Sequence, residues 1–366
     1  MSREDALAIW RAGVDAVGGY AAVQRALEGT SRPDGILAVG KAAAEMARAA
    51  HDAFPDVPAL VVTKDGHGAT LPQGVELMES AHPVPDARSL AAGQALRRAT
   101  EDMPPGSHLL LLVSGGASSL AEDLVHGKTL DDLAALNRAL LASGKDITAM
   151  NAERRRISRV KGGGLLSAFR GRAVTVLAIS DVPGDDLGVI GSGIGSAPEH
   201  PAFDYTARII ASNTIARDAA TAEARRRGLP VLDAQEALHD DLHRLTAYWG
   251  PRLRDMARGV IVLGGEPTVR LPANPGRGGR NQALALALAR EIADTQGLTL
   301  VVGGTDGSDG PTDDAGGIVD GSTWEPDAAT ALNHADSGSF LERKAALLTT
   351  GPTGTNVMDL LVAVRD

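Results

Sequence analysis

The chain of 366 residues contains no cysteine, which excludes disulfide bonds and metal sites built on thiolates. Aromatic residues make up only 3%, so the apolar volume comes mainly from alanine, leucine and valine. The net charge is −10 and no long basic run occurs, which argues against a nucleic-acid partner. The acidic, amphipathic start SREDALAIWRAG is neither a signal peptide nor a membrane span. A cytoplasmic protein without a membrane partner is therefore expected.

The length exceeds what one hydrophobic core usually holds, so two domains are expected. Apolar runs predict strands at 36–39, 59–62, 109–113, 173–179, 208–211, 260–263 and 298–302. Helical patterns occupy 41–54, 87–100, 130–141, 161–169, 214–227, 234–258 and 281–292. This alternation predicts an α/β fold with mostly parallel sheets. We expect one α/β domain over residues 1–235 and a second over residues 236–366.

One pattern recurs, in which an apolar strand is followed by glycines, polar residues and a helix. It occurs at Gly40–Lys41, Ser114–Gly116, Gly264–Glu266 and Gly303–Asp306. In parallel sheets, ligands bind in the crevice beyond the carboxyl ends of the strands. The convergence of four such motifs predicts a ligand site.

The first motif, GILAVGKA from Gly35, nearly matches a phosphate loop. The match fails, because ILAV is a strand and Ala42 replaces the hydroxyl that would hold magnesium. Lys41 opens a predicted helix, where a cation opposes the helix dipole, so a bound anion is expected beside it. The alternative is an exposed lysine without a ligand.

The second motif, VSGGASSL from Val113, follows the most apolar strand. Gly115 and Gly116 allow close approach to a ligand, and successive N–H groups at a helix start form an anion cradle. A nucleophile elbow is excluded because Leu120 stands where its last glycine belongs. A helix cap by Ser114 is compatible with the cradle.

The segment SDVPGDDLGVIGSGIGS from Ser180 carries carboxylates directly after a strand. Asp181 and Asp185 are suited to hold Mg²⁺ through oxygen or ordered water. Its GSGIGS portion, with Ser192 and Gly193, lacks the spacing and the preceding strand of a dinucleotide fingerprint.

The segment GGEPTVRLPANPGRGGRNQ from Gly264 places Glu266 at a strand end and Arg280 at a helix start. A guanidinium at a helix start suits a phosphate or a carboxylate. Arg277, the other cation of the glycine-rich part, is expected to be solvated.

Residues 303–317, GGTDGSDGPTDDAGG, contain six glycines and four aspartates. An EF-hand is excluded, because Asp306 and Asp309 lie three positions apart. A plain turn would account for the glycines but not for their place directly after the strand LTLVV. A divalent ion bound by both carboxylates remains as the interpretation.

Two further motifs are weaker. The HDDLH sequence from His239 mimics a zinc-binding helix, but a solvated helix face explains it better. The GPTGTNVMDL sequence offers Thr353, Thr355, Asn356 and Asp359 as a polar ligand wall, and a turn before a helix or strand explains it equally well.

Taken together, these motifs resemble the type II family of glycerate 2-kinases, whose C-terminal half is called the MOFRL domain. The resemblance rests on VGKAAAEMA, TKDGHG, AHPVPD, VSGGASSL, VKGGGL, SDVPGDD, GGEPTV, GGRNQALALA, GTDGSDGPTDDAGG and GPTGTNVMDL. It implies a kinase that uses ATP and Mg²⁺ to convert D-glycerate into 2-phosphoglycerate. It also implies a Rossmann-like N-terminal domain and a MOFRL-type C-terminal domain, with the active site in the cleft between them.

The resemblance assigns the family's essential lysine to Lys41 and its essential arginine to Arg280, and we add Asp181 as a third catalytic residue. Metal binding is expected at Asp306 and Asp309. Substrate or nucleotide binding is expected at Ser114, Gly115, Gly116, Ser118, Asp185, Ser192, Gly193, Glu266, Asn281, Thr305 and Asn356.

The chain departs from the family pattern at two places. It has Ser192-Gly193-Ile194 where SGP is usual, and NAERRRIS from Asn151 where N-x-V-R-K-H-L-S is usual. Another small hydroxy acid therefore stays open as the substrate.

A hydroxypyruvate reductase using NAD(P)H is the alternative enzyme, although no strand–GxGxxG–helix unit is present. A non-catalytic sensor is the third alternative, and a monomer and a homodimer are both compatible with the sequence.

Overall fold

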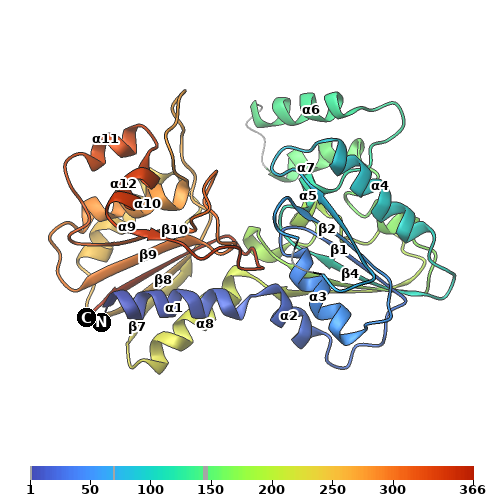
Figure 1. Ribbon diagram of the computed structural model, residues 1–366, viewed down its shortest axis with the longest axis horizontal. Coiled ribbons are helices and arrows are strands. Elements are labelled where there is room, and N and C mark those ends of the chain that lie inside the picture. The colour runs from blue at the N-terminus through green and yellow to red at the C-terminus, as the bar shows by residue number, and fades with distance from the viewer. Residues whose placement is uncertain (1, 69–70, 143–146) are drawn as a thin grey trace. The chain divides into compact units, whose positions relative to one another are not determined.

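The computed structural model describes residues 2–68, 71–142 and 147–366, which form two compact units with one six-stranded sheet each (Figure 1). The parallel-sheet unit comprises Gly18–Ser212 and Gly354–Asn356. The mixed-sheet unit comprises Met1–Val17, Asn213–Thr353 and Val357–Asp366. The predicted α/β class is confirmed, whereas the expected cleft between two domains stays a prediction. None of the helices in the described ranges is both long and apolar enough to cross a membrane.

The sheet of the parallel-sheet unit has the strand order β3-β2-β1-β4-β5-β6, and all neighbouring strands are parallel. This is the Rossmann order, as predicted. Its strands are β1 Gly35–Val39, β2 Ala59–Lys64, β3 Val75–Ser80, β4 His108–Val113, β5 Ala173–Ile179 and β6 Asp204–Ala211.

The central strand β4 is buried along its whole length because helices cover both faces of the sheet. On one face, Leu96 of α4 packs in a cluster with Leu111 and Val113. Helices α2 and α3 pack together and contact the strands. The helices of this unit are α2 Gly19–Ala26, α3 Ala43–Ala53, α4 Ala87–Glu101, α5 Ala117–Leu120, α6 Leu130–Ala142 and α7 Ile147–Arg156, with short 3₁₀ turns η1 Leu166–Ala168, η2 Pro183–Asp185 and η3 Ile190–Ser192.

The predicted helix at residues 161–169 is wrong. This segment forms consecutive turns that end in η1, and both Gly162 and Gly163 adopt positive φ (57° and 86°). A left-handed backbone cannot continue a right-handed helix. Helix α7, which precedes this segment, was not predicted.

The sheet of the mixed-sheet unit has the order β11-β10-β9-β12-β8-β7. Strand β12 runs antiparallel to β8 on one side and to β9 on the other, and β7 and β8 form the parallel pair. The prediction of a mostly parallel sheet is therefore wrong for this unit, because a late strand is inserted between two parallel ones. Its strands are β7 Val231–Glu236, β8 Gly259–Gly265, β9 Leu298–Gly304, β10 Gly316–Asp320, β11 Leu347–Leu348 and β12 Asp359–Arg365.

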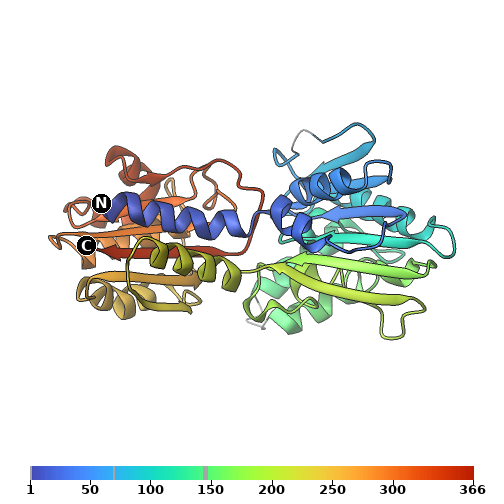
Figure 2. The ribbon, with the colours of Figure 1, turned by 90° about the horizontal axis from the view of Figure 1, so that it is seen from below.

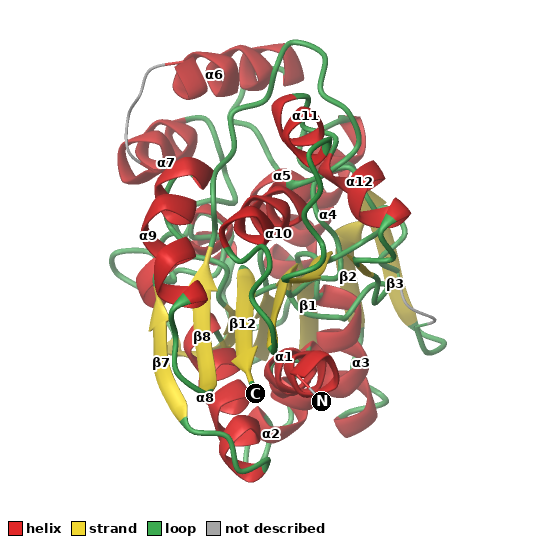
Figure 3. Ribbon diagram, turned by 90° about the vertical axis from the view of Figure 1, so that its left-hand side faces the viewer, coloured by secondary structure: helices red, strands yellow, loops and turns green. Residues whose placement is uncertain are grey.

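Strand β12 alternates its side chains between two apolar layers. Leu361 and Ala363 join the cluster of α9 and α10, whereas Leu360 and Val362 join the cluster of α1 and α8. Figures 2 and 3 show α1 and α8 side by side on one face of the sheet, with α9 and α10 on the other. The helices of this unit are α1 Ser2–Ala16, α8 Asn213–Arg226, α9 Leu242–Arg254, α10 Arg280–Glu291, α11 Ala328–Asn333 and α12 Ser337–Arg343.

The compact units do not coincide with the predicted division at residue 235. Helices α1 and α8 both cover the mixed sheet, so the N-terminal segment and residues 213–235 lie with the C-terminal part of the chain. The predicted helix at 234–258 begins only at Leu242, because residues 231–236 form β7. An amphipathic helix carries no local signal for the sheet that it will cover.

We predict that Trp10→Ala destabilises the mixed-sheet unit alone. Trp10 is fully buried in α1, and its indole N–H donates to the Leu360 carbonyl at 3.1 Å. The cavity should cost about 3–5 kcal/mol of unfolding free energy. Hydrogen exchange read by mass spectrometry should rise in β9 and β12 but not in β1 and β4. The exposed Tyr248→Ala is the matched control, and equal changes in both sheets would contradict the division described above.

Candidate active site

The first candidate cluster lies where the order of the parallel sheet reverses. Strands β1 and β4 are neighbours in the sheet, although two strands separate them in the chain. Gly40 and Lys41 follow β1, and Ser114–Gly116 follow β4. Ligands of doubly wound sheets bind at this switch point, so two predicted motifs meet where a ligand site is expected.

The loops after β1 and β4 are joined by backbone hydrogen bonds. The Lys41 N–H donates to the Gly115 carbonyl at 2.9 Å, and the Ala42 N–H donates to Ser114 Oγ at 3.0 Å. A Cβ atom on Gly40, whose φ is 127°, would lie 2.2 Å from Ser114 Oγ. Ser114 therefore holds the backbone just before α3, and glycine is needed at position 40.

Lys41 lies two residues before α3, which begins at Ala43, so the predicted start of this helix at Lys41 is wrong. Its side chain is half-buried. A Cβ atom on Gly116 would meet Lys41 Cγ at 3.1 Å and the ring of His82 at 3.3 Å. The Lys41 stem and the His82 ring thus flank Gly116, which puts both side chains at the predicted anion cradle.

Gly115 brings two further predicted residues to the same place. A Cβ atom on Gly115 would lie 2.1 Å from Asp181 Oδ2 and 2.4 Å from Asn356 Nδ2. Asn356 donates to Asp181 Oδ2 at 3.4 Å. Asp181 follows β5, the neighbour of β4, so residues from three adjacent strand ends meet in one cluster.

Two predicted serines extend this cluster away from the sheet. Ser118 Oγ and Ser192 Oγ are hydrogen-bonded at 2.8 Å, and Ser192 donates to Asn151 Oδ1 at 3.2 Å. Gly193 is held by the N–H of Gly163, which donates to its carbonyl at 3.0 Å. Asn151 was noted only as part of a sequence departure, because its serine partners lie far away in the chain.

Asp185 differs from the other predicted carboxylates. It has a left-handed backbone with φ 56°, a conformation that costs a non-glycine residue about 1 kcal/mol. Within the described ranges its carboxylate makes no hydrogen bond or ion pair. A strained residue with an unpaired carboxylate is typical of a ligand-binding position.

The sequence did not reveal an ion pair buried beside this cluster. Lys161 Nζ donates to Glu122 Oε2 at 2.6 Å, and the side chains are 3% and 0% exposed. Ser158 donates to the other oxygen of Glu122 at 2.5 Å. The pair ties the segment after α5 to the glycine-rich turn at 162–164, which itself bonds to residues 192 and 193.

The second candidate cluster lies in the mixed-sheet unit, around the first residue of α10. Arg280 Nε and Nη2 donate to the two carboxylate oxygens of Asp359 at 2.7 and 3.2 Å, and Nη1 lies 2.6 Å from Glu266 Oε1. Burial disfavours the charged form of Arg280, but Asp359 and Glu266 outweigh burial and raise its pKa. The protein itself therefore supplies the anions that the position of Arg280 indicated.

The two aspartates predicted to bind metal have carboxylate oxygens engaged within the protein. Asp309 accepts the N–H groups of Asn281 at 3.1 Å and Gln282 at 2.8 Å, and so caps α10 from a distant loop. Burial raises the pKa of Asp309 to about 7, against the opposing effect of these donors. Asp306 Oδ1 accepts the N–H and the hydroxyl of Ser308, both at 3.0 Å. No described group of three or more acidic, histidine or cysteine side chains is arranged to hold a metal.

Two predicted nucleotide-binding residues of this unit have different surroundings. The Thr305 hydroxyl donates to the Met358 carbonyl at 2.6 Å and accepts the Val357 N–H at 2.9 Å, so it joins two backbone segments. Asn281 is 1% exposed, and its side-chain amide finds no hydrogen-bond partner among the described residues. Asn281 is thus the better candidate for ligand contact.

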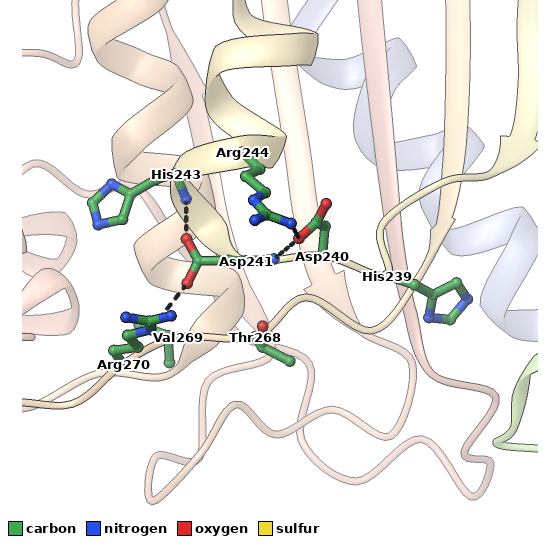
Figure 4. A pocket seen from close by; sticks show the side chains of 8 residues that line it. All are labelled: His239, Asp240, Asp241, His243, Arg244, Thr268, Val269 and Arg270. Atoms are coloured by element: carbon green, nitrogen blue, oxygen red, sulfur yellow. Dashed lines mark hydrogen bonds and ion pairs between the residues drawn. The ribbon is translucent and has the colours of Figure 1, made fainter. Parts of the chain in front are cut away.

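The HDDLH segment does not lie on one helix face, because α9 begins only at Leu242 and His239 precedes it. Figure 4 shows His239 and His243 pointing away from each other, on opposite sides of Asp240 and Asp241. His239 Nε2 lies 2.8 Å from Glu236 Oε1. Asp241 accepts the His243 N–H at 3.0 Å as the cap of α9.

Comparison with known families divides the chain into two matched regions. Residues 5–227 match the domain of unknown function DUF4147, and residues 259–359 match the MOFRL family.

Three relatives match nearly the whole chain. The glycerate 2-kinase of Pyrococcus horikoshii is 35% identical, over 90% of this chain and 86% of that protein. A provisionally named hydroxypyruvate reductase of Agrobacterium vitis is 36% identical, over 90% of this chain and 87% of that protein. The crystal structure of the glycerate kinase of Thermotoga maritima superposes with a TM-score of 0.88 at 32% identity, and the match covers 100% of this chain and 99% of that one.

We predict that Gly115→Ala disables the site while the protein stays folded. The added methyl group would overlap Asp181 and Asn356, and displacements of about 1 Å can reduce catalytic rates on the order of a hundredfold. The kcat of Gly115→Ala should fall on the order of a hundredfold, whereas the urea concentration at the midpoint of unfolding should change little. The control is Gly35→Ala, whose methyl group would meet the flexible end of Met103. Equal activities of the Gly115→Ala and Gly35→Ala variants would refute the assignment of the active site to the cluster around Gly115.

Proposed function

The chain belongs to the family of proteins that join a DUF4147 domain to a MOFRL domain, and from this premise we propose that it is a glycerate 2-kinase. The proposed reaction transfers the terminal phosphoryl group of ATP to the 2-hydroxyl group of D-glycerate. The similarity to glycerate kinases over 90% or more of the chain supports this proposal.

One structural observation carries the proposal, namely the meeting of Lys41, Gly115 and Asp181 at the switch point. Phosphoryl transfer requires mainly that the reactants be positioned and that their negative charge be stabilised. Lys41 supplies a compact positive charge for a phosphoryl oxygen. The backbone at Gly115 and Gly116 supplies a surface that phosphates can approach closely.

Asp181 is the residue suited to receive the proton of the attacking hydroxyl group. A general base must come within hydrogen-bond reach of the proton that it removes. Asn356 holds one carboxylate oxygen of Asp181 and thereby fixes its orientation. Ser118 lies two residues beyond the cradle and is suited to contact the acceptor substrate.

Magnesium fits this proposal through the chemistry of its expected ligands. Asp181 and Asp185 offer carboxylate oxygens, and Asp185 has no partner elsewhere in the described chain. Asp185 is therefore a better candidate than Asp306 and Asp309, whose oxygens accept hydrogen bonds from the protein. When bound, Mg²⁺ would neutralise charge on the phosphates of ATP.

The guanidinium group of Arg280 has one buried and one exposed carboxylate partner. The side chain of Asp359 is 2% exposed and binds two nitrogens of Arg280. The side chain of Glu266 is 46% exposed and contacts only Nη1. We propose that an anionic ligand takes the place of Glu266 at Nη1. Asp359 would then be the positioning residue that keeps the guanidinium fixed.

A hydroxypyruvate reductase is the alternative, supported by the provisional name of one relative. Such an enzyme needs a nicotinamide site, and the turn after β1 reads VGKA instead of GxGxxG. The kinase is therefore the better account. A cytoplasmic enzyme that acts on small molecules, as a monomer or a homodimer, completes the proposal.

The decisive assay separates these functions. Purified protein with ATP, Mg²⁺ and D-glycerate should form 2-phosphoglycerate, identified by phosphorus NMR, and EDTA should abolish the reaction. Asp185→Asn should raise the magnesium concentration needed for half-maximal activity. Oxidation of NAD(P)H by hydroxypyruvate without any ATP-dependent product would overturn the kinase in favour of the reductase.

Lys41→Ala and Arg280→Ala should each lower kcat on the order of a hundredfold, since both remove charge that stabilises the transition state. The control variant is Lys128→Ala, which alters an exposed lysine.

Arg280→Ala should also lower the free energy of unfolding by about 3–5 kcal/mol, because Asp359 is left as an unpaired buried charge. Adding Asp359→Asn should recover stability but not kcat. Near-normal kcat in a folded Lys41→Ala or Arg280→Ala enzyme would remove that residue from the mechanism.

A further inference from the structure

Among the described residues, no carboxylate balances the charge of Arg154. This arginine lies in the last turn of α7 and is half-buried. Its Nε donates to Asn137 Oδ1 at 3.1 Å, and its Nη1 donates to Asn151 Oδ1 at 3.3 Å. Both acceptors are neutral amides, and Nη2 makes no hydrogen bond to a described residue. Burial without a counter-charge lowers the pKa of Arg154.

Two nearby cations are paired. Lys161 meets Glu122 at 2.6 Å, and Arg156 meets Glu153 at 3.0 Å. Within the described ranges Arg154 has no ion pair at all. Arg155, the next residue, makes no ion pair with a described residue either, but it is exposed and donates to the Gly188 carbonyl at 2.6 Å, whereas Arg154 is half-buried. A partly buried guanidinium held by amide oxygens alone is suited to receive an anion from outside the protein.

A chain of hydrogen bonds connects Arg154 to the candidate active site. The amide oxygen of Asn151 that accepts from Arg154 also accepts from the Ser192 hydroxyl at 3.2 Å. Ser192 is hydrogen-bonded in turn to Ser118 at 2.8 Å, two residues beyond the cradle at Gly116. Both Asn151 and Ser192 are buried, so this series of hydrogen bonds is a fixed part of the parallel-sheet unit.

The chemistry of Arg154 favours a carboxylate. The planar fork of a guanidinium matches the two oxygens of a carboxylate, and its two amide partners hold the fork in one orientation. Arg280, the other arginine of the candidate sites, already has such a pair with Asp359.

We propose that Arg154, oriented by Asn137 and Asn151, binds the carboxylate group of the acceptor substrate in the parallel-sheet unit. This inference rests on the proposed function and assigns the acceptor specificity of that reaction. Arg154 therefore selects small hydroxy acids over neutral polyols and amides. Asn151 and Asn137 act as positioning residues.

The test compares Arg154→Gln with the matched control Arg156→Gln, which alters an exposed arginine of the same helix. D-Glycerate and its neutral carboxamide, glyceramide, serve as acceptors. Arg154→Gln should raise the KM for D-glycerate roughly 10- to 100-fold, the usual value of a hydrogen bond to a charged group. The KM values for ATP and for glyceramide should stay within about threefold. Arg154→Lys should recover part of the loss, and circular dichroism should confirm that each variant is folded.

An unchanged KM for D-glycerate, an equal rise for glyceramide, or a rise for ATP instead would overturn the proposal. Calorimetric titration with D-glycerate separates this inference from the proposed function. Binding that depends on Arg154 without phosphorylation would refute the kinase and retain the carboxylate site. Phosphorylation of D-glycerate whose binding does not depend on Arg154 would retain the kinase and refute the carboxylate site. If D-glycerate is neither bound nor phosphorylated, both the kinase and the carboxylate site are overturned.

Discussion

The candidate site depends on one steric constraint, which is that the loops after β1 and β4 share the same space. Neighbouring parallel strands deliver these loops side by side, and side chains at Gly40 and Gly115 would overlap Ser114, Asp181 and Asn356. Because both positions are glycine, backbone groups of one loop bond directly to the other. The resulting junction fixes the backbone at Lys41, and the absence of a side chain at Gly115 leaves room for Asp181 beside it.

Charge pairing then decides which cations are held within the protein and which can face a ligand. Burying a charge is costly unless a partner compensates it, and the pairs Lys161–Glu122 and Arg280–Asp359 meet this requirement. Both pairs join segments distant in the chain, so they set loop positions. Among the described residues Arg154 has only amide partners, so under our proposal its charge would give an anionic substrate an electrostatic advantage over a neutral one.

The fold was predictable from sequence where burial left a local pattern. Strands β4, β8 and β9 are apolar runs because both of their faces are covered. Strand β7 exposes part of its length and therefore carries a polar sequence that looked helical. The insertion of β12 between β8 and β9 leaves no trace in local composition, because strand order is decided by contacts between distant segments.

The site was predictable in its positions but not in its pairings. Glycines and polar residues directly after apolar strands identified Lys41, Gly115 and Asp181, since strand ends converge in a parallel sheet. Arg280 at the start of α10 is paired with anions, as expected for a cation that opposes the helix dipole. The sequence did not show that the protein supplies one such anion itself, since Asp359 lies 79 positions away in the chain, and an anionic ligand at Nη1 stays a prediction. Arg154 differs, because the described residues offer it amide oxygens and no carboxylate, and for this reason we propose an anionic substrate as its partner.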